Sequence, residues 1–283
     1  MKNIKSVITL LAVSFLAAAV ARADIISAQE VKTLMNDNEN LVIIDANKYE
    51  NYRSVHLEGA VHIYHTSLYQ GGDVPGLIKS PAELADIFGK KGVSTNSTIV
   101  IYDDAGQLYS SRVYWILKYL GAENVRLLHK DIDVWCKAGL PLSTRPTRVD
   151  PVTFTPDPIP NLNASTDYVR DHKDDPNVVL VDVRTPAEFD GTAKNSEGHI
   201  AGAINLNYTD LLTETGAFKE ASELTDIATA NGLAPEKEII FYCRTSVRGT
   251  VSFAAFESVL GYENVKVYDG AHVEWKKSNP VIQ

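Results

Sequence analysis

The chain contains an internal repeat, and this repeat limits the folds it can adopt more than any other feature. The run LVIID at Leu41–Asp45 is echoed by VVLVD at Val178–Asp182, and HLEGA at 56–60 is echoed by HIAGA at 199–203. Further matches keep one spacing of 140 positions: Tyr102 with Tyr242, Gly121 with Gly261, Asn124 with Asn264 and Trp135 with Trp275. Chance similarity between unrelated segments is a poor explanation for one constant register, so we expect two copies of a single fold.

Each copy alternates short apolar runs with segments of helical character. In the first copy, Leu41–Asp45 and Thr98–Tyr102 predict buried strands because they are rich in β-branched residues. Helix signals surround them: Ser27 with Glu30 before a helix to about Asn36, Ser80 with Pro81 and Glu83, and a segment from about Tyr109 to Leu120 that Gly121 closes. This alternation predicts the α/β class, with a mostly parallel sheet flanked by helices in each copy.

The first 23 residues have the features of a signal peptide. A membrane anchor would need about 20 apolar residues, and this stretch has fewer. We therefore expect the mature chain to begin near Asp24 and to be periplasmic or secreted, with no membrane association after cleavage. The signals are Lys2 and Lys5, the largely apolar residues 7–20, and the cleavage motif Ala21-Arg22-Ala23.

The segment 146–160 carries five prolines, at positions 146, 151, 156, 158 and 160. Proline-rich segments are typical of stiff linkers between domains. We therefore expect one domain at 24–145 and a second at 161–283.

The composition excludes several classes of function. A net charge of −9 without a basic stripe argues against nucleic acid as a partner. The chain has two cysteines, Cys136 and Cys243, with no C-x-x-C motif and no His and Cys cluster at metal spacing. We expect neither a metal nor another cofactor, and a monomer.

Cys243 stands where a strand gives way to a helix. Ile239 to Tyr242 predicts a short buried strand, and 247–260 has helical length, closed by Gly261. The backbone N–H groups of a tight loop at a helix N-terminus form a cradle that binds anions and favours a thiolate. A buried structural cysteine is the alternative. The position of Cys243, with Arg244 and Arg248 close by in the sequence, favours a nucleophile.

The first copy has Asp103 at the position of Cys243. A carboxylate cannot carry a sulfur, and it would repel an anionic ligand. Only the second copy is therefore equipped for thiol chemistry, and the cleft between the copies is a natural place for a ligand.

The whole mature chain resembles the two-domain sulfurtransferases of the rhodanese family. In the second copy the resemblance rests on 182–184 with 188–189, on 198–203, on 242–244, and on 268–270 with 274–275. In the first copy, Tyr102-Asp103-Asp104 followed by Arg112 and Trp115 is similar to the inactive domain of that family. The resemblance implies two tandem rhodanese-like domains and a ping-pong reaction. A Cys243 persulfide would take sulfur from thiosulfate or 3-mercaptopyruvate and pass it to cyanide or another thiophile.

The resemblance also implies roles for residues around the cysteine. The loop Arg244, Thr245, Ser246, Val247 and Arg248 would bind the donor, with Asp182, Arg184, Glu188 and Tyr109 in support. Some alternatives stay open at this point. Arg248 either clamps the donor anion or is a solvated helix residue. Asp182 and Arg184 either orient the loop or only tie the strand to it, and Tyr109 either lines the donor pocket or is plain core. His199 is expected to hold a loop through a ring N–H rather than to act as a base.

Three positions depart from the family pattern. Ser246 stands where glycine is common, which matters if that residue needs a positive φ. Glu188 and Thr245 stand where thiosulfate-using members tend to carry cations, so donor identity stays open. Phosphatases of this general fold need C-x5-R, whereas Cys243 to Arg248 is C-x4-R, one residue short. A non-catalytic binding module is disfavoured by the cysteine itself. A persulfide carrier that serves a protein partner is the remaining alternative.

Overall fold

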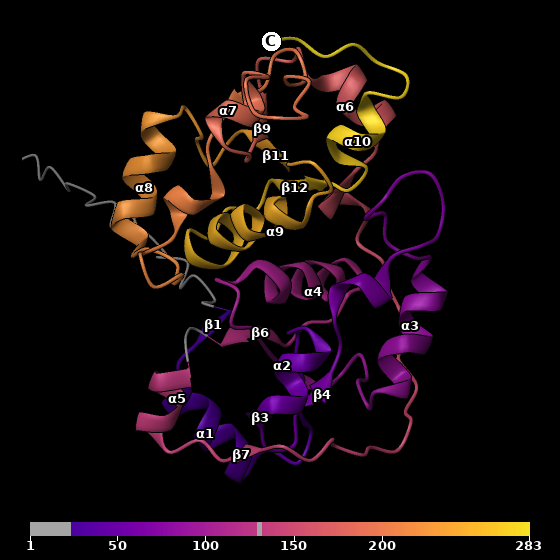
Figure 1. Cartoon of the computed structure of the whole chain (residues 1–283), viewed down its shortest axis with the longest axis vertical. Helices are drawn as coiled ribbons and strands as arrows, with labels where there is room; N and C mark the ends of the chain where they lie inside the picture. The colour runs from indigo at the N-terminus through magenta and orange to yellow at the C-terminus, as the bar shows by residue number, and fades with distance from the viewer. Residues whose placement is uncertain (1–23, 129–131) are drawn as a thin grey trace, which may run out of the picture.

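The structure, a computed structural model, describes residues 24–128 and 132–283, and it consists of two similar domains stacked along the long axis (Figure 1). Each domain is built on a five-stranded sheet in which every neighbouring pair of strands is parallel, in the orders β1-β6-β5-β2-β4 and β10-β9-β11-β12-β8. The expected pair of α/β domains with parallel sheets is therefore confirmed. The predicted signal peptide lies outside the described residues. Among those residues, no helix is long and apolar enough to cross a membrane.

The first domain runs in the order β1 (Ile25–Ile26), α1 (Ala28–Asp37), β2 (Leu41–Asp45), α2 (Tyr49–Ser54), β3 (His56–Leu57), β4 (Val61–His62), η1 (His65–Leu68), α3 (Pro81–Lys90), β5 (Thr98–Tyr102), α4 (Leu108–Tyr119), β6 (Val125–Leu128), α5 (Ile132–Ala138) and β7 (Leu142–Ser143). The capping box predicted at Ser27 and the N-cap predicted at Ser80 are both present. At each, the hydroxyl accepts from the backbone N–H of the glutamate three residues on, and that glutamate accepts from the serine N–H, so Ser80 forms a capping box as well. A small antiparallel pair, β3 with β7, lies outside the main sheet.

The second domain follows the same plan: η2 (Pro160–Leu162), β8 (Asn163–Ala164), α6 (Thr166–His172), β9 (Val178–Asp182), α7 (Pro186–Phe189), β10 (Ile204–Asn205), η3 (Tyr208–Leu211), α8 (Ala221–Ala230), β11 (Glu238–Tyr242), α9 (Val247–Ala254), η4 (Ala255–Val259), β12 (Val265–Tyr268) and α10 (Ala271–Trp275). The central pairs have the same register in both domains, with Asp45 opposite Tyr102 and Asp182 opposite Tyr242. The repeat in the sequence is therefore a repeat in the fold.

The two domains meet through α4 and α9, which lie side by side at the junction (Figure 1). Both helices are buried along most of their length, and one hydrophobic core joins side chains such as Trp115 of α4 and Phe253 of α9. Because each of these helices starts directly after a loop at the carboxyl end of its central strand, the packing brings the Asp103 loop and the Cys243 loop toward the same junction.

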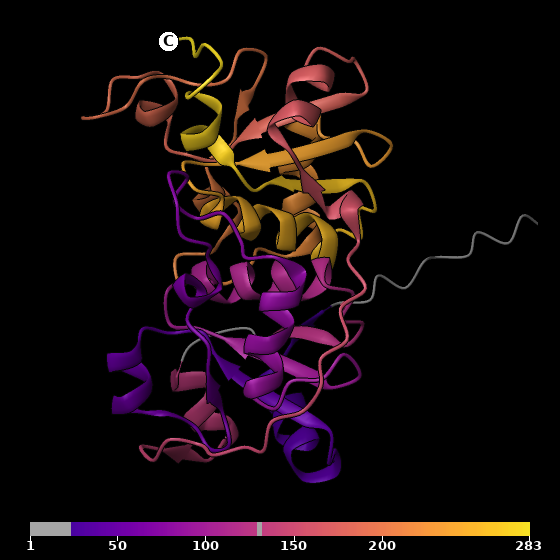
Figure 2. The ribbon, with the colours of Figure 1, turned by 90° about the vertical axis from the view of Figure 1, so that its right-hand side faces the viewer.

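The proline-rich segment has no helix or strand before η2 begins at Pro160, but its contacts hold it in place. It runs along the first domain (Figure 2). Its Val152 N–H donates to the carbonyl of Gly89 at 2.9 Å, and its Asp157 N–H donates to the carbonyl of Leu120 at 3.0 Å. Phe154 is buried, with its ring centroid 5.9 Å from that of Phe88. These contacts fix the segment to the first domain.

The helix expected at 247–260 is interrupted. Regular α-helix ends at Ala254, and η4 is a π-helix whose Leu260 N–H donates to the carbonyl of Ala255. A π-turn holds one more residue than the α-helix it replaces. In the first domain, α4 has no such turn, but the loop before it is one residue longer: five positions separate Asp103 from the start of α4, against four from Cys243 to the start of α9. The residue missing from the Cys243 loop is regained in the π-turn. The spacing of 140 between the two copies is therefore the same before the loop and after the helix.

Candidate active site

Cys243 is the first residue after β11, and its position is fixed by the backbone on both sides. The side chain is buried, with 1% of its surface exposed. The carbonyls of Cys243 and Arg244 accept from the N–H groups of His272 and Val273, at 3.1 and 3.2 Å, at the start of α10. Cys136 is exposed on α5, and both cysteines are free thiols.

The loop between Cys243 and α9 needs a left-handed residue. Ser246 has a φ of +57°, which confirms the concern that this position requires the conformation glycine adopts most easily. Ser246 is buried, and its hydroxyl donates to the carbonyl of Tyr268. Thr245 packs against the other domain, because a Cβ placed on Gly76 would lie 3.0 Å from the Thr245 Cβ.

Arg248 is held by Glu188. The two side chains form a double hydrogen bond, with Nη1 to Oε2 at 2.7 Å and Nη2 to Oε1 at 2.8 Å. The bonds from Arg248 lower the pKa of Glu188 to about 2. Burial lowers the pKa of Arg248, but its bonds to Glu188 and the adjacent Cys243 outweigh burial and raise it. Arg248 therefore stays charged beside the thiol, but both of its Nη atoms already donate to Glu188.

A small hollow adjoins the loop, and its lining carries more positive than negative side chains. Its volume is about 80 Å³. His272 in its wall is 4% exposed, and burial, then the charge of Arg184, lowers its pKa to about 4, so the ring is neutral at pH 7. The charged lining residues are Arg184, Lys194, Arg244 and Lys276, against Glu188 and Glu197. Of the two loop arginines, the exposed Arg244 is thus the one that faces this hollow.

Asp182 and Arg184 form a buried ion pair at the end of β9, with Nη2 to Oδ2 at 2.6 Å. The same Nη2 donates to the carbonyl of Gly198 at 2.7 Å, so the pair ties the strand end to the turn before His199. His199 has the structural role expected of it: its Nδ1 bonds the carbonyl of Phe189 at 3.0 Å, and the two rings stack at 3.5 Å.

The corresponding loop of the first domain surrounds the side chain of Asp103. The buried Asp103 carboxylate accepts four backbone N–H groups, from Ala105 and Gln107 on Oδ1 at 2.9 and 3.0 Å, and from Tyr109 and Ser110 on Oδ2 at 2.7 and 2.6 Å. Burial raises the pKa of Asp103, and these N–H donors oppose the rise. Inward-pointing donors of the kind expected around Cys243 are therefore present in the corresponding loop of the first domain, where the Asp103 carboxyl group accepts from them.

The first domain also presents aromatic side chains at the junction. Tyr109, at the start of α4, stacks on His65 with ring centroids 4.9 Å apart, and Tyr64 meets Tyr109 edge-on at 5.1 Å. Sequence reasoning singled out Tyr109 but missed His65 and Tyr69 of the same group. Neither lies in a motif, and only the fold brings them together.

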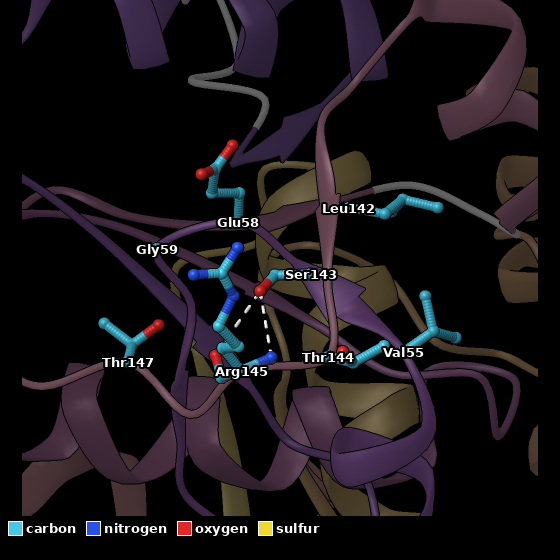
Figure 3. Close-up of a pocket in the computed structure, with 8 residues that line it drawn as sticks. All are labelled: Val55, Glu58, Gly59, Leu142, Ser143, Thr144, Arg145 and Thr147. Atoms are coloured by element: carbon cyan, nitrogen blue, oxygen red, sulfur yellow. Dashed lines mark hydrogen bonds between the residues drawn. The ribbon is translucent and has the colours of Figure 1, made fainter.

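A larger hollow of about 620 Å³ lies elsewhere, beside β3 and β7 of the first domain (Figure 3). In Figure 3 the Ser143 hydroxyl bonds the backbone of Arg145, and the hollow is an open surface feature without a thiol. Its lining has no cysteine, so it offers no nucleophilic sulfur. It is lined by Val55, Glu58, Gly59, Leu142, Ser143, Thr144, Arg145 and Thr147.

Known proteins resemble this chain along most of its length. The rhodanese-like domain model matches twice, at residues 27–138 and 165–278. The chain is 27% identical over 242 residues to the thiosulfate sulfurtransferase of Pseudomonas aeruginosa, which covers 83% of this chain and 88% of that one. It is 30% identical over 238 residues to the sulfur carrier protein TtuD of Thermus thermophilus, which covers 74% of this chain and 84% of that one. A structure of EanB in complex with ergothioneine superposes with a TM-score of 0.84 at 24% identity, over 92% of this chain and 70% of the other, and so supports the fold alone.

Both halves of the repeat match one domain model, and both sheets have the same order and register. The chain therefore belongs to the rhodanese family of sulfurtransferases, with two rhodanese-like domains in tandem.

Proposed function

We propose that the protein moves a sulfane sulfur from thiosulfate, or from 3-mercaptopyruvate, to cyanide or another small thiophile. The Cys243 thiolate attacks the outer sulfur of thiosulfate; a new S–S bond forms, the old one breaks, and its electron pair leaves with sulfite. The acceptor then attacks the outer sulfur of the persulfide. The thiolate leaves with the electron pair of that bond, and thiocyanate is released when cyanide is the acceptor.

The observation that carries this proposal is the correspondence between the Cys243 loop and the Asp103 loop of the first domain. The Asp103 loop binds a carboxylate through four backbone N–H groups, and Cys243 occupies the same place between a central strand and a junction helix. A cradle of this kind favours a thiolate and a persulfide anion over their neutral forms. Arg248 adds a permanent positive charge beside the sulfur.

The donor anion is expected in the small hollow beside the loop. Its cations, Arg244 and Lys194 among them, suit a sulfonate or carboxylate group. Arg248 is less available, since its fork is bonded to Glu188. The same pairing disfavours a phosphatase, which needs that arginine to surround a phosphate.

A carrier that hands its sulfur to a protein is the second candidate, because one relative bears that name. The burial of Cys243 favours small acceptors, since a protein would need to insert a narrow segment or separate the domains.

The persulfide tests the proposal directly. After thiosulfate treatment, mass spectrometry should find one added sulfur on the peptide that contains Cys243. The adduct should be absent in Cys243→Ser and retained in the matched control Cys136→Ser, as should thiocyanate formation from cyanide. A sulfur adduct on Cys136 alone would overturn the assignment.

A further inference from the structure

Arg112 on α4 is a completely buried cation whose hydrogen bonding is incomplete. Its exposed fraction is 0%. Nη2 donates to the carbonyl of Gly76 at 2.8 Å and also bonds Asp269 of the second domain. Among the described residues, Nε and Nη1 have no hydrogen-bond partner. A buried donor without a partner has lost its hydrogen bonds to water without replacement, and a charged donor loses most, so such groups usually face a ligand or water.

His65 presents another buried polar atom on the same side of the junction. The residue is 7% exposed, its Nδ1 contacts the hydroxyl of Tyr69, and its Nε2 has no partner within the described chain. Tyr69 contacts both groups: its hydroxyl bonds His65 Nδ1 and interacts with the Arg112 guanidinium, whose Cζ is 5.4 Å from the Tyr69 ring centroid.

The direction of the contact between Tyr69 and His65 follows from chemistry. Burial lowers the pKa of His65 to about 4 and raises that of Tyr69 to about 12, so both side chains are neutral at pH 7. The neighbouring Arg112 has only donors, so the Tyr69 proton is directed to His65 Nδ1. The single ring proton of His65 is then on Nε2. Arg112 Nε, Arg112 Nη1 and His65 Nε2 are thus three buried donors without acceptors among the described residues.

We propose that a small oxyanion, of the size of sulfite or thiosulfate, accepts hydrogen bonds from these unpartnered donors of Arg112 and His65. An oxyanion supplies several acceptor atoms to donors that the protein leaves without partners. The inactive domain then contributes a binding site and does not serve only as a scaffold.

This site is connected to the cysteine loop through a short segment of the first domain. Arg112 holds the carbonyl of Gly76, and Gly76 packs against Thr245 of the loop. Two residues on, the Ile78 N–H donates to Asp269 at 3.0 Å. Identification of the anion as the product released by the sulfur donor rests on the proposed function, but anion binding itself does not.

Calorimetric titration of Cys243→Ala with sodium sulfite separates the two questions, because this variant cannot transfer sulfur. Adding His65→Leu removes the Nε2 donor and should weaken binding about tenfold or more. Adding His65→Gln keeps an N–H donor at that place, so the Kd for sulfite should stay within about threefold of its value in Cys243→Ala. Adding Arg112→Met should abolish binding at this site, but it also breaks the pair with Asp269, so the His65 variants carry the conclusion.

Arg244→Ala in the same background controls for the hollow beside the loop. It should leave a sulfite site that remains sensitive to His65→Leu. Binding unchanged by His65→Leu would mean that water satisfies these donors, and loss of all binding in Arg244→Ala would put the anion in the hollow. Either result overturns the proposal without touching the persulfide test.

Discussion

The Asp103 loop and the Cys243 loop each join a central strand to a junction helix, but one begins with a carboxyl group and the other with a thiol. Each follows a buried tyrosine at the end of a central strand, and each reaches its helix through a left-handed residue, Gln107 or Ser246. In the first loop the carboxylate takes up the backbone donors permanently. In the second, the Cys243 sulfur stands in that place. The comparison teaches that one loop position can hold a carboxyl group that the backbone satisfies or a thiol, and of the two only the thiol offers sulfur as a nucleophile.

The two loops also differ in charge. The Cys243 loop carries Arg244 and Arg248, while the corresponding start of the first loop carries Asp104, whose Oδ2 accepts from Asn51 at 2.8 Å. The second residue of the following helix is Arg248 in one domain and Tyr109 in the other. Positive charge is thus concentrated in the loop where the proposed anionic donor would approach.

The largest effect is expected from making the second loop like the first. Cys243→Asp removes the nucleophile, and thiocyanate formation should fall by more than about 10³-fold. The fold should remain, because the cradle accepts a carboxylate in the twin loop. Thermal unfolding and circular dichroism check the fold, and Cys136→Ser serves as the active control. A variant that unfolds would show that the shorter loop cannot hold a carboxylate and that the two cradles differ.

A smaller effect is expected when the first loop loses its anion. An asparagine side chain offers one acceptor oxygen where the carboxylate of Asp103 offers two, so Asp103→Asn leaves two of the four backbone N–H groups facing an amide NH₂. We expect the free energy of unfolding to fall by roughly 2–4 kcal/mol. Urea unfolding measures it, with the exposed Asp104→Asn as the matched control. Equal small losses in both variants would contradict a structural role for the cradle.

The smallest effect concerns the left-handed residues. The first loop shares this conformation between Gly106 and Gln107, each at a φ of 65°, whereas Ser246 adopts it alone at 57°. Ser246→Ala and Ser246→Gly both lose the bond to Tyr268, but only glycine relieves the strain. The glycine variant should therefore be more stable than the alanine variant by about 1 kcal/mol in thermal unfolding. The reverse order would mean that the loop changes conformation.

Much of the fold and the place of the cysteine were predictable because they depend on neighbours in the sequence. The strands Leu41–Asp45 and Thr98–Tyr102 begin and end where β-branched runs do, and the helix caps at Ser27 and Ser80 form as their side chains indicate. A positive φ at Ser246 was raised by the family resemblance, because glycine is common at that position, and the φ of +57° bears it out.

The tertiary structure decided which of these groups meet. The sequence marks Arg248 as a cation beside the thiol, but its bond to Glu188, 60 positions away, depends on how α7 packs against the loop. The donors of Arg112 and His65 that lack a partner among the described residues are buried only once the chain has folded. The shorter loop and the π-turn in η4 cancel in the numbering, so the constant spacing of 140 concealed both. Local patterns fix strands, caps and turns, because these depend on adjacent residues; charge pairing and desolvation depend on surfaces that only the folded chain brings together.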